Sequence, residues 1–239
     1  MRSIRYAGND FSELCSAEVV ARAPLPVVTD AMPVPGRAGA LLVSGRVPAS
    51  DVTVRLFLDM GFKGSENALA DARHNLAFWL CLLGGGELVL PDEPERVYRD
   101  AVMVDVGDWS SLFSDGKCDV TFRLYDPVAY GLKRVERTST FEVGGTWPTW
   151  PEFALVASAG DGLSVSCPAL GTAIALDYAF AGGEAVVIDS EAEDVRINDA
   201  AARDVVTLSS DFLALEPGNC TLAFSGCSYA ETRFFERWL

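Results

Sequence analysis

The segment at residues 66–83 reads ENALADARHNLAFWLCLL and is the one stretch of the chain with a helical pattern. Its apolar side chains, from Leu69 through Leu76 to the end of the segment, recur at the three- and four-residue spacing of one helix face. Ser65 before it is a suitable N-cap, and Gly84 after it is a suitable C-terminal stop. We therefore expect a single helix at about residues 66–83, with one face packed against a sheet.

The polar face of this helix carries Asn67, Asp71 and His74. We expect it to meet water or a neighbouring subunit, and these three residues are candidate subunit contacts. His74 is the sole histidine of the chain, and its place on the polar side fits a surface residue better than a catalytic base or a metal ligand.

Alternation of apolar and polar residues dominates the rest of the first half. Residues 52–58, 102–106 and 118–124 each place an apolar side chain at every second position. A period of two puts those side chains on one face of a β-sheet. Turn signals such as PVPGRAG at residues 33–39 separate the runs, and one helix is too few for βαβ crossovers, so antiparallel strands are predicted.

A domain boundary is predicted at VGGTWPTWP, residues 143–151, because two glycines and two prolines do not fit within a central strand. We expect a first domain at residues 1–143 and a second at residues 144–239. The second half contains about seven short strand patterns, which is typical of a β-sandwich. These patterns lie at residues 153–157, 163–167, 174–178, 185–188, 205–208, 220–224 and 229–235.

Three tryptophans lie at the predicted boundary or beside the C-terminus, namely Trp147, Trp150 and Trp238. Burial at the junction of the two domains is the favoured interpretation, with stacking on a glycan as the alternative. Residues 234–239 are apolar enough to be ordered and buried, and we expect them to pack back against the first domain.

The chain has 239 residues, with 19 basic and 34 acidic side chains and a formal net charge of −15. Tight binding to nucleic acid uses lysine and arginine to displace counterions from phosphates, so this composition does not favour it. The sequence has no run of about 18 apolar residues and no apolar signal core at its N-terminus, so no membrane insertion is expected.

A search for reaction chemistry finds no catalytic motif. The sequence has no G-x-S-x-G elbow, no G-x-G-x-x-G loop and no C-x-x-C pair, and its six cysteines fit small apolar residues in a reducing cytosol. Acidic clusters at residues 92–95 and 189–194 are expected to be solvated loop charges rather than a glycosidase pair or a calcium site. We therefore predict no enzyme activity, no metal and no cofactor.

Several short motifs occur in an order that resembles the distal tail protein family of long-tailed bacteriophages and prophages. YAGND at residues 6–10 resembles the opening strand of that family, and PGRAG at residues 35–39 resembles its Pro-Gly-Arg-x-Gly turn. LVLPDEP at residues 88–94 with Tyr98 is similar to the family's apolar run followed by aspartate and tyrosine. YDPVAY at residues 125–130 resembles its aspartate–proline strand end.

In the second half, VID at residues 187–189 and LEPGN at residues 215–219 are similar to further marks of the family, and the match covers nearly the whole chain. The resemblance implies a mainly β fold, in which an antiparallel N-terminal domain with one helix forms a ring and a galectin-like β-sandwich follows. It implies a homohexameric ring in the tail tip of the virion, assembled in the host bacterial cytoplasm. The implied partners are the tail tube protein and a tail fibre, tail-associated lysin or receptor-binding protein, with DNA passing through the channel.

Three hypotheses follow, of which the structural tail-tip hub is preferred. The second is a carbohydrate-binding β-sandwich that attaches to the host cell surface and displays Trp147, Trp150 or Tyr178. The third is a hydrolase that uses the acidic clusters. We also expect the net negative charge to serve in part the wall of the channel, since like charges repel and keep DNA from binding there.

Overall fold

The computed structural model describes residues 3–22, 24–59 and 66–239. The chain divides into two compact units, of which the first comprises residues 1–130 with Leu239 and the second comprises residues 131–238. The predicted division after residue 143 assigns residues 131–143 to the first domain, whereas the structure groups them with the second unit. Among the described residues, no helix is both long and apolar enough to cross a membrane.

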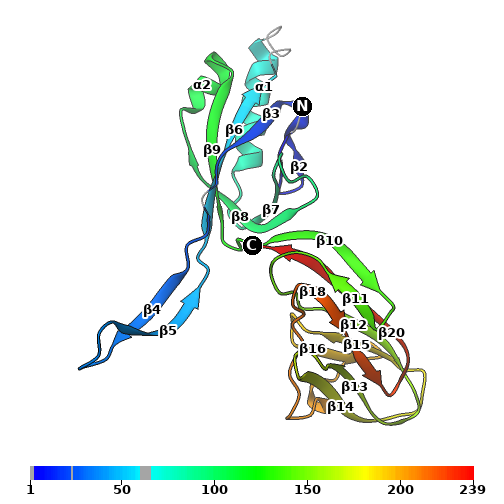
Figure 1. Ribbon diagram of the computed structural model, residues 1–239. Coiled ribbons are helices and arrows are strands. Elements are labelled where there is room, and N and C mark those ends of the chain that lie inside the picture. The colour runs from blue at the N-terminus through cyan, green and yellow to red at the C-terminus, as the bar shows by residue number, and fades with distance from the viewer. Residues whose placement is uncertain (1–2, 23, 60–65) are drawn as a thin grey trace. The chain divides into compact units, whose positions relative to one another are not determined.

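The first unit is built from antiparallel strands and short helices (Figure 1). They are β1 (Arg5–Tyr6), β2 (Asn9–Asp10), the 3-10 helix η1 (Phe11–Glu13), β3 (Cys15–Arg22), β4 (Val28–Pro33), β5 (Ala40–Arg46), β6 (Ser50–Leu58), α1 (Glu66–Leu80), β7 (Gly86–Val89), β8 (Val97–Val106), α2 (Trp109–Ser114) and β9 (Lys117–Leu124). Strand β10 (Ala129–Glu136) begins in this unit, where Ala129 and Tyr130 pair with β8.

Strands β3, β6, β9 and β8 form the main antiparallel sheet of this unit, in that order. The predicted alternation is confirmed in β6 and β9, whose apolar side chains point to one buried face. Val54, Val120 and Phe122 are fully buried there. Apart from Phe57, the opposite face of β6 and β9 carries polar and charged side chains, which is typical of an antiparallel sheet with one solvated face.

Strand β8 departs from the simple alternation predicted for residues 102–106. Val104 is 41% exposed and lies where the register with β9 shifts, between Met103 and Asp105. An extra residue at such a bulge turns the side chains around it relative to the sheet. Tyr98 and Ala101 are the buried residues of β8, so its apolar pattern alone does not identify the inward face.

Helix α1 buries Ala72, Leu76 and Leu80, as the predicted spacing requires. Trp79 meets Phe11 edge-on, with 5.3 Å between the ring centroids. This contact fixes the last turn of α1 on η1, at the start of the chain.

Two details of the helix prediction are wrong. Helix α1 ends at Leu80 rather than at residue 83, because the Leu82 amide donates to the Leu80 carbonyl in a tighter turn. The single helix predicted is joined by α2, of 6 residues, whose N-terminus is capped by an Asp108 carboxylate that accepts from the Ser110 amide at 3.0 Å. Such a short helix leaves too few turns for a periodic signal.

The second unit contains the rest of β10 and ten further strands among the described residues. Its elements are β11 (Thr140–Val143), β12 (Glu152–Ala157), β13 (Gly160–Cys167), β14 (Thr172–Phe180), β15 (Ala185–Asp189), β16 (Asp194–Ile197), β17 (Ala200–Ala201), the 3-10 helix η3 (Arg203–Val205), β18 (Gly218–Thr221), β19 (Ala223–Ser225) and β20 (Cys227–Trp238).

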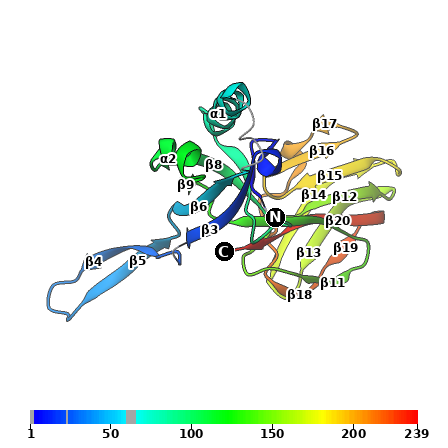
Figure 2. The same cartoon turned by 90° about the horizontal axis from the view of Figure 1, so that it is seen from above.

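These strands form a β-sandwich, which confirms the predicted class (Figure 2). One layer runs β17, β16, β15, β12, β20 and β10, and the other contains β14, β13 and β19 together with the pair β11–β18. Apolar side chains from both layers fill the core, including Phe153, Val165, Ile174, Val186 and Phe234.

The strand predicted at residues 205–208 is wrong. This segment follows η3 in a turn, in which Val206 makes one bridge to Leu176 and the Thr207 amide donates to the Ala175 carbonyl at 3.0 Å. It therefore covers an edge of β14 without extending the sheet, one of the ways in which proteins protect edge strands.

Candidate assembly interface

Strands β4 and β5 form a hairpin, which we call the arm, that reaches away from the main sheet of the first unit (Figures 1 and 2). Every residue of both strands is exposed, including Leu42 at 64% and Val43 at 62%. Paired residues place Met32 with Leu41 on one face and Ala31 with Leu42 on the other. A hairpin of two strands is marginally stable alone in water, so this apolar arm is a candidate contact with another molecule.

The PGRAG motif forms the tip of the arm. Gly36 and Gly39 have φ angles of +79° and +86°, in the left-handed region that favours glycine. Residues 24–49 carry Arg37, Arg46 and Asp30 as their charged side chains, which is +2 and −1 and sums to +1 in a chain of net charge −15. The arm is therefore complementary in charge to the rest of the chain.

An apolar groove of about 200 Å³ lies in the same unit between α1, β8 and α2. Its lining residues are Ala77, Leu80, Met103, Val106 and Trp109. An open apolar surface of this kind is typical of a protein-binding site.

The polar face predicted for α1 lies on the same helix as the groove residues Ala77 and Leu80. Asp71 and His74 are exposed, whereas the side chain of Asn67 lies outside the described residues. Phe78 follows His74 by one helical turn and is 77% exposed. The exposure of Phe78 was not predicted, because one exposed aromatic residue does not change a helical pattern. The role of this face as a subunit contact stays a prediction.

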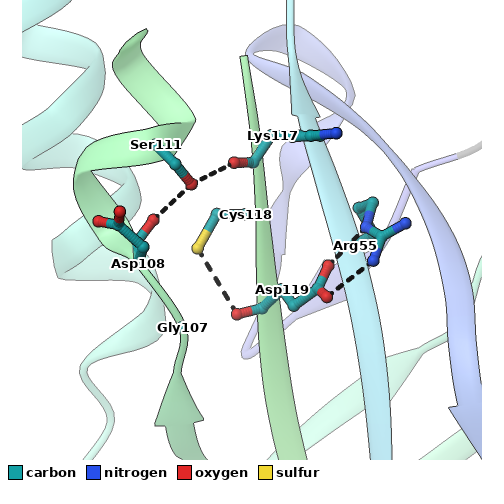
Figure 3. A pocket seen from close by; sticks show the side chains of 7 residues that line it. All are labelled: Arg55, Gly107, Asp108, Ser111, Lys117, Cys118 and Asp119. Atoms are coloured by element: carbon teal, nitrogen blue, oxygen red, sulfur yellow. Dashed lines mark hydrogen bonds and ion pairs between the residues drawn. The ribbon is translucent and has the colours of Figure 1, made fainter. Parts of the chain in front are cut away.

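A second hollow, of about 260 Å³, is polar and lies where α2 meets β9 (Figure 3). Arg55 donates to Asp119 through two hydrogen bonds of 2.6 and 2.9 Å, and the Ser111 hydroxyl donates to the Lys117 carbonyl at 2.7 Å. Burial, aided by nearby carboxylates, raises the pKa of the Cys118 thiol, which is the reverse of what a nucleophilic cysteine needs. The Ser111 hydrogen bond holds α2 on β9, and the Arg55–Asp119 pair joins β6 to β9.

In the second unit, Arg237 lies among the three predicted tryptophans. Its guanidinium is 4.8 Å from the ring centroid of Trp150 and donates to Glu191 at 2.7 Å. Its carbonyl accepts the Trp147 amide at 3.1 Å, and Trp238 follows it in the chain. A cation occupies one face of the Trp150 ring, so the geometry favours a structural role over glycan stacking there. The location of Trp147, Trp150 and Trp238 at a domain junction stays a prediction.

Glu231 on β20 is a buried carboxylate held by three donors. Arg233 donates to it at 2.6 Å, the Tyr229 hydroxyl at 2.8 Å and Arg137 at 3.0 Å. Together these hydrogen bonds, that of Arg233 first, lower the pKa of Glu231 from 4.5 to about 2. Arg233 also donates to Glu152 at 2.8 Å, which links β20 to β12.

Residues 144–238 match the family model of the siphovirus-type tail component, C-terminal domain. The second unit is therefore similar to a siphovirus-type tail component domain, and we refer to it as the tail component domain. The crystal structure of SPP1 Dit (gp 19.1), described as a paradigm of the hub adsorption apparatus in phages that infect Gram-positive hosts, is similar to the entire chain. The TM-score is 0.80 at 19% sequence identity, with 100% of both chains covered.

Two structures of the phage P2 baseplate in its activated conformation, with Ca and with Sr, are more distant. They have TM-scores of 0.42 and 0.40 and identities of 10% and 11%, over 92% of this chain and 90% of each of theirs. A comparison with curated proteins found no match. The likeness to SPP1 Dit confirms the predicted fold, including the galectin-like second domain.

Two tyrosine–carboxylate hydrogen bonds lie within the motifs at residues 88–98 and 125–130, which resemble motifs of distal tail proteins. The Tyr98 hydroxyl donates to Glu93 and the Tyr130 hydroxyl donates to Asp126, both at 2.7 Å. The Arg99 guanidinium lies 3.8 Å from the ring centroid of Tyr130. Each pair closes the turn next to a strand, so these motifs stabilise the scaffold on which the arm and the groove are placed.

The acidic clusters also stabilise turns. Asp92 and Glu93 form ion pairs with Arg22 at 3.6 and 3.2 Å. In the tail component domain, the Asp189 carboxylate accepts the Glu191 and Ala192 amides, both at 3.0 Å. The described part of the chain contains no group of three His, Cys, Asp or Glu side chains placed to hold a metal ion.

Replacing Glu231 with glutamine is expected to lower the melting temperature of the tail component domain at neutral pH, because two arginines lose their shared anion. The folded-state pKa of Glu231 is below its ordinary 4.5, so its contribution is complete above about pH 4.5 and is lost as the pH falls toward about 2. Melting curves of both proteins across this range should converge in acid. Glu193→Gln, which removes an exposed pair with Arg203, is the control and should change little.

Proposed function

We propose that this protein is a non-catalytic hub of a phage tail tip, in which six copies close into a ring that joins the tail tube to the host-recognition apparatus. The likeness to SPP1 Dit over the whole of both chains carries this proposal, because that protein is described as a hub of an adsorption apparatus. The siphovirus-type tail component domain supports the same placement in a virion.

The surfaces of the first unit support assembly by a head-to-tail contact. A closed ring needs two different patches on each copy, which meet across every interface after a fixed rotation. The arm and the apolar groove are two such patches, and both expose apolar side chains. The arm carries a charge of +1 in a chain of net charge −15, so it is attracted to other copies of the chain. The arm of one copy therefore seats in the groove of the next.

The remaining partners follow from the position of a hub. One side of the ring contacts the tail tube protein, and the tail component domain anchors a tail fibre, a tail-associated lysin or a receptor-binding protein. DNA passes through the ring without being bound by it. Copies assemble in the host bacterial cytoplasm and function in the released virion.

The experiment that tests this proposal is a measurement of the mass of the purified protein in solution. Light scattering should give about six times the monomer mass of 25.6 kDa, or a stacked pair of such rings, and electron microscopy should show a central hole. A protein that stays monomeric at every concentration would contradict the proposal. Binding of cell-wall glycan by such a monomer would instead support the carbohydrate-binding alternative.

A further inference from the structure

The arm is inserted in the chain between the last residue of β3, Arg22, and the first residue of β6, Ser50. The described links on either side of the arm strands, residues 24–27 and 47–49, contain prolines at positions 24, 26 and 48. Proline fixes its own φ angle and restricts the residue before it, so links of this composition are semi-rigid. The direction of the arm therefore depends on how its root at Arg22 is held.

A β-bulge in β3 turns the side chain of Arg22 toward the buried face of the main sheet. Val19 pairs with Val54 before the bulge, and Arg22 pairs with Val52 after it, so β3 advances by one more residue than β6. Without the bulge, Ala21 would stand opposite Val52. Directly paired residues share a face, and Val52 is fully buried, so the bulge places Arg22 at the end of the buried face.

On that face, Arg22 contacts the turn that joins β7 to β8. Its guanidinium forms ion pairs with Asp92 at 3.6 Å and Glu93 at 3.2 Å, and lies 5.6 Å from the ring centroid of Tyr98. Glu93 is held in turn, because it accepts the Tyr98 hydroxyl at 2.7 Å and Arg96 at 3.1 Å. A guanidinium that contacts two carboxylates and an aromatic ring has few positions available to it. We call Arg22, Asp92, Glu93 and Tyr98 the latch.

We infer that Arg22 is a positioning residue, because the latch fixes the root of the arm and so directs the arm before copies meet. This inference rests on the proposed ring. Arg96 and Tyr98 already satisfy Glu93 within the turn, so the turn itself does not need Arg22. Partly exposed ion pairs add little to the stability of a fold, which also favours a role in positioning. An arm that is already directed loses less conformational entropy on binding, so copies assemble more tightly.

The first test measures how widely the arm moves in the monomer. Spin labels are placed at Leu42→Cys on the arm and Lys117→Cys on β9, after Cys81→Ser and Cys227→Ser have removed the thiols that are not buried. The exposed Phe78 is replaced with aspartate so that the labelled protein stays monomeric, which light scattering verifies. Pulsed electron paramagnetic resonance then gives the distribution of distances between the two labels.

Two variants matched in charge separate positioning from local stability. Arg22→Gln removes the latch cation and should make the distance distribution about twofold broader. Arg96→Gln removes a cation from the same Glu93 carboxylate, and its side chain is 33% exposed against 32% for Arg22, but it leaves the root of the arm in place. The distribution of that control should stay as narrow as in the parent. Asp92→Asn with Glu93→Gln removes the latch from its other side and should broaden the distribution as Arg22→Gln does.

The second test measures assembly of the unlabelled protein, in which Phe78 and all six cysteines are retained. Analytical ultracentrifugation gives the concentration at which half of the copies are assembled. Arg22→Gln should raise this concentration about tenfold, because each arm must then lose its motion on binding. Arg96→Gln should assemble at the same concentration as the parent.

The outcomes separate this inference from the function on which it rests. If the Arg22→Gln and Arg96→Gln proteins give distributions of equal width, Arg22 does not position the arm, whether or not a ring forms. A broader distribution with unchanged assembly also overturns the inference, because the direction of the arm would then contribute nothing to the interface. A parent protein that never assembles contradicts the proposed ring instead, and the label distances still decide whether Arg22 positions the arm.

Discussion

Replacement of Gly145 with alanine is expected to destabilise the tail component domain by about 3 kcal/mol or more. Gly145 has a φ of +100°, and a Cβ added to it would stand 2.1 Å from the Arg237 carbonyl oxygen. That oxygen accepts the amides of Thr146 and Trp147 at 2.8 and 3.1 Å, so the clash would also break these two hydrogen bonds. Urea denaturation followed by tryptophan fluorescence measures the loss, since Trp147 and Trp150 lie next to the site.

Gly183→Ala is the matched control for this variant. Gly183 lies in the same unit with a φ of +97°, and an added Cβ there would meet nothing within 4 Å. Its free energy of unfolding should fall only by the cost of placing alanine in a left-handed backbone conformation, about 1–2 kcal/mol. If both variants lose the same free energy of unfolding, the close approach of Gly145 to Arg237 is not what requires glycine there.

Replacement of Leu42 with aspartate should leave the protein folded and abolish its assembly. Leu42 is exposed within the chain, but it would be desolvated if the arm seats in the groove of another copy. A buried charge without a partner costs each interface about 2–3 kcal/mol, roughly a hundredfold in affinity. Phe78→Asp, on the exposed surface of α1 next to Ala77 of the groove in the chain, should have the same effect. Light scattering should then report the monomer mass of 25.6 kDa for both variants.

A control and a mixing experiment make this prediction specific. Leu208 is also an exposed leucine, but it belongs to the second unit, which contains neither the arm nor the groove, so Leu208→Asp should assemble normally. When Leu42→Asp and Phe78→Asp proteins are mixed, one intact arm and one intact groove remain for each pair. The mixture should form dimers, because one heterologous contact cannot close a ring. A mixture that stays monomeric would contradict the contact between arm and groove.

The periodic parts of the fold could be predicted from the sequence because their apolar side chains face one core. Alternation identified β6 and β9, and helical spacing identified the buried residues of α1. The arm could not be identified in this way. Its apolar residues point to both sides of an isolated hairpin, so the pattern has no single inward face.

The candidate sites were harder to predict because they depend on residues distant in sequence. The tryptophans at positions 147 and 150 were selected from composition, but their partner Arg237 lies at the other end of the unit and gives no local signal. The apolar groove is formed by residues of α1, β8 and α2, and these elements are not adjacent in the chain, so the groove could not be predicted from a local pattern. The exposure of Phe78 was not predicted either, because it lies within the helical pattern of α1. Strand β8 was misread because a bulge changes the direction of side chains without a distinctive composition.

Strand β20 lies between β12 and β10 in the middle of a layer, yet it follows both of them along the chain. During synthesis, β12 therefore leaves the ribosome long before the strand that pairs with its edge. Until β20 emerges, the nascent sandwich presents an open edge of the kind that recruits strands from other molecules. A stalled or prematurely terminated chain would keep that edge, which makes truncated products prone to aggregate.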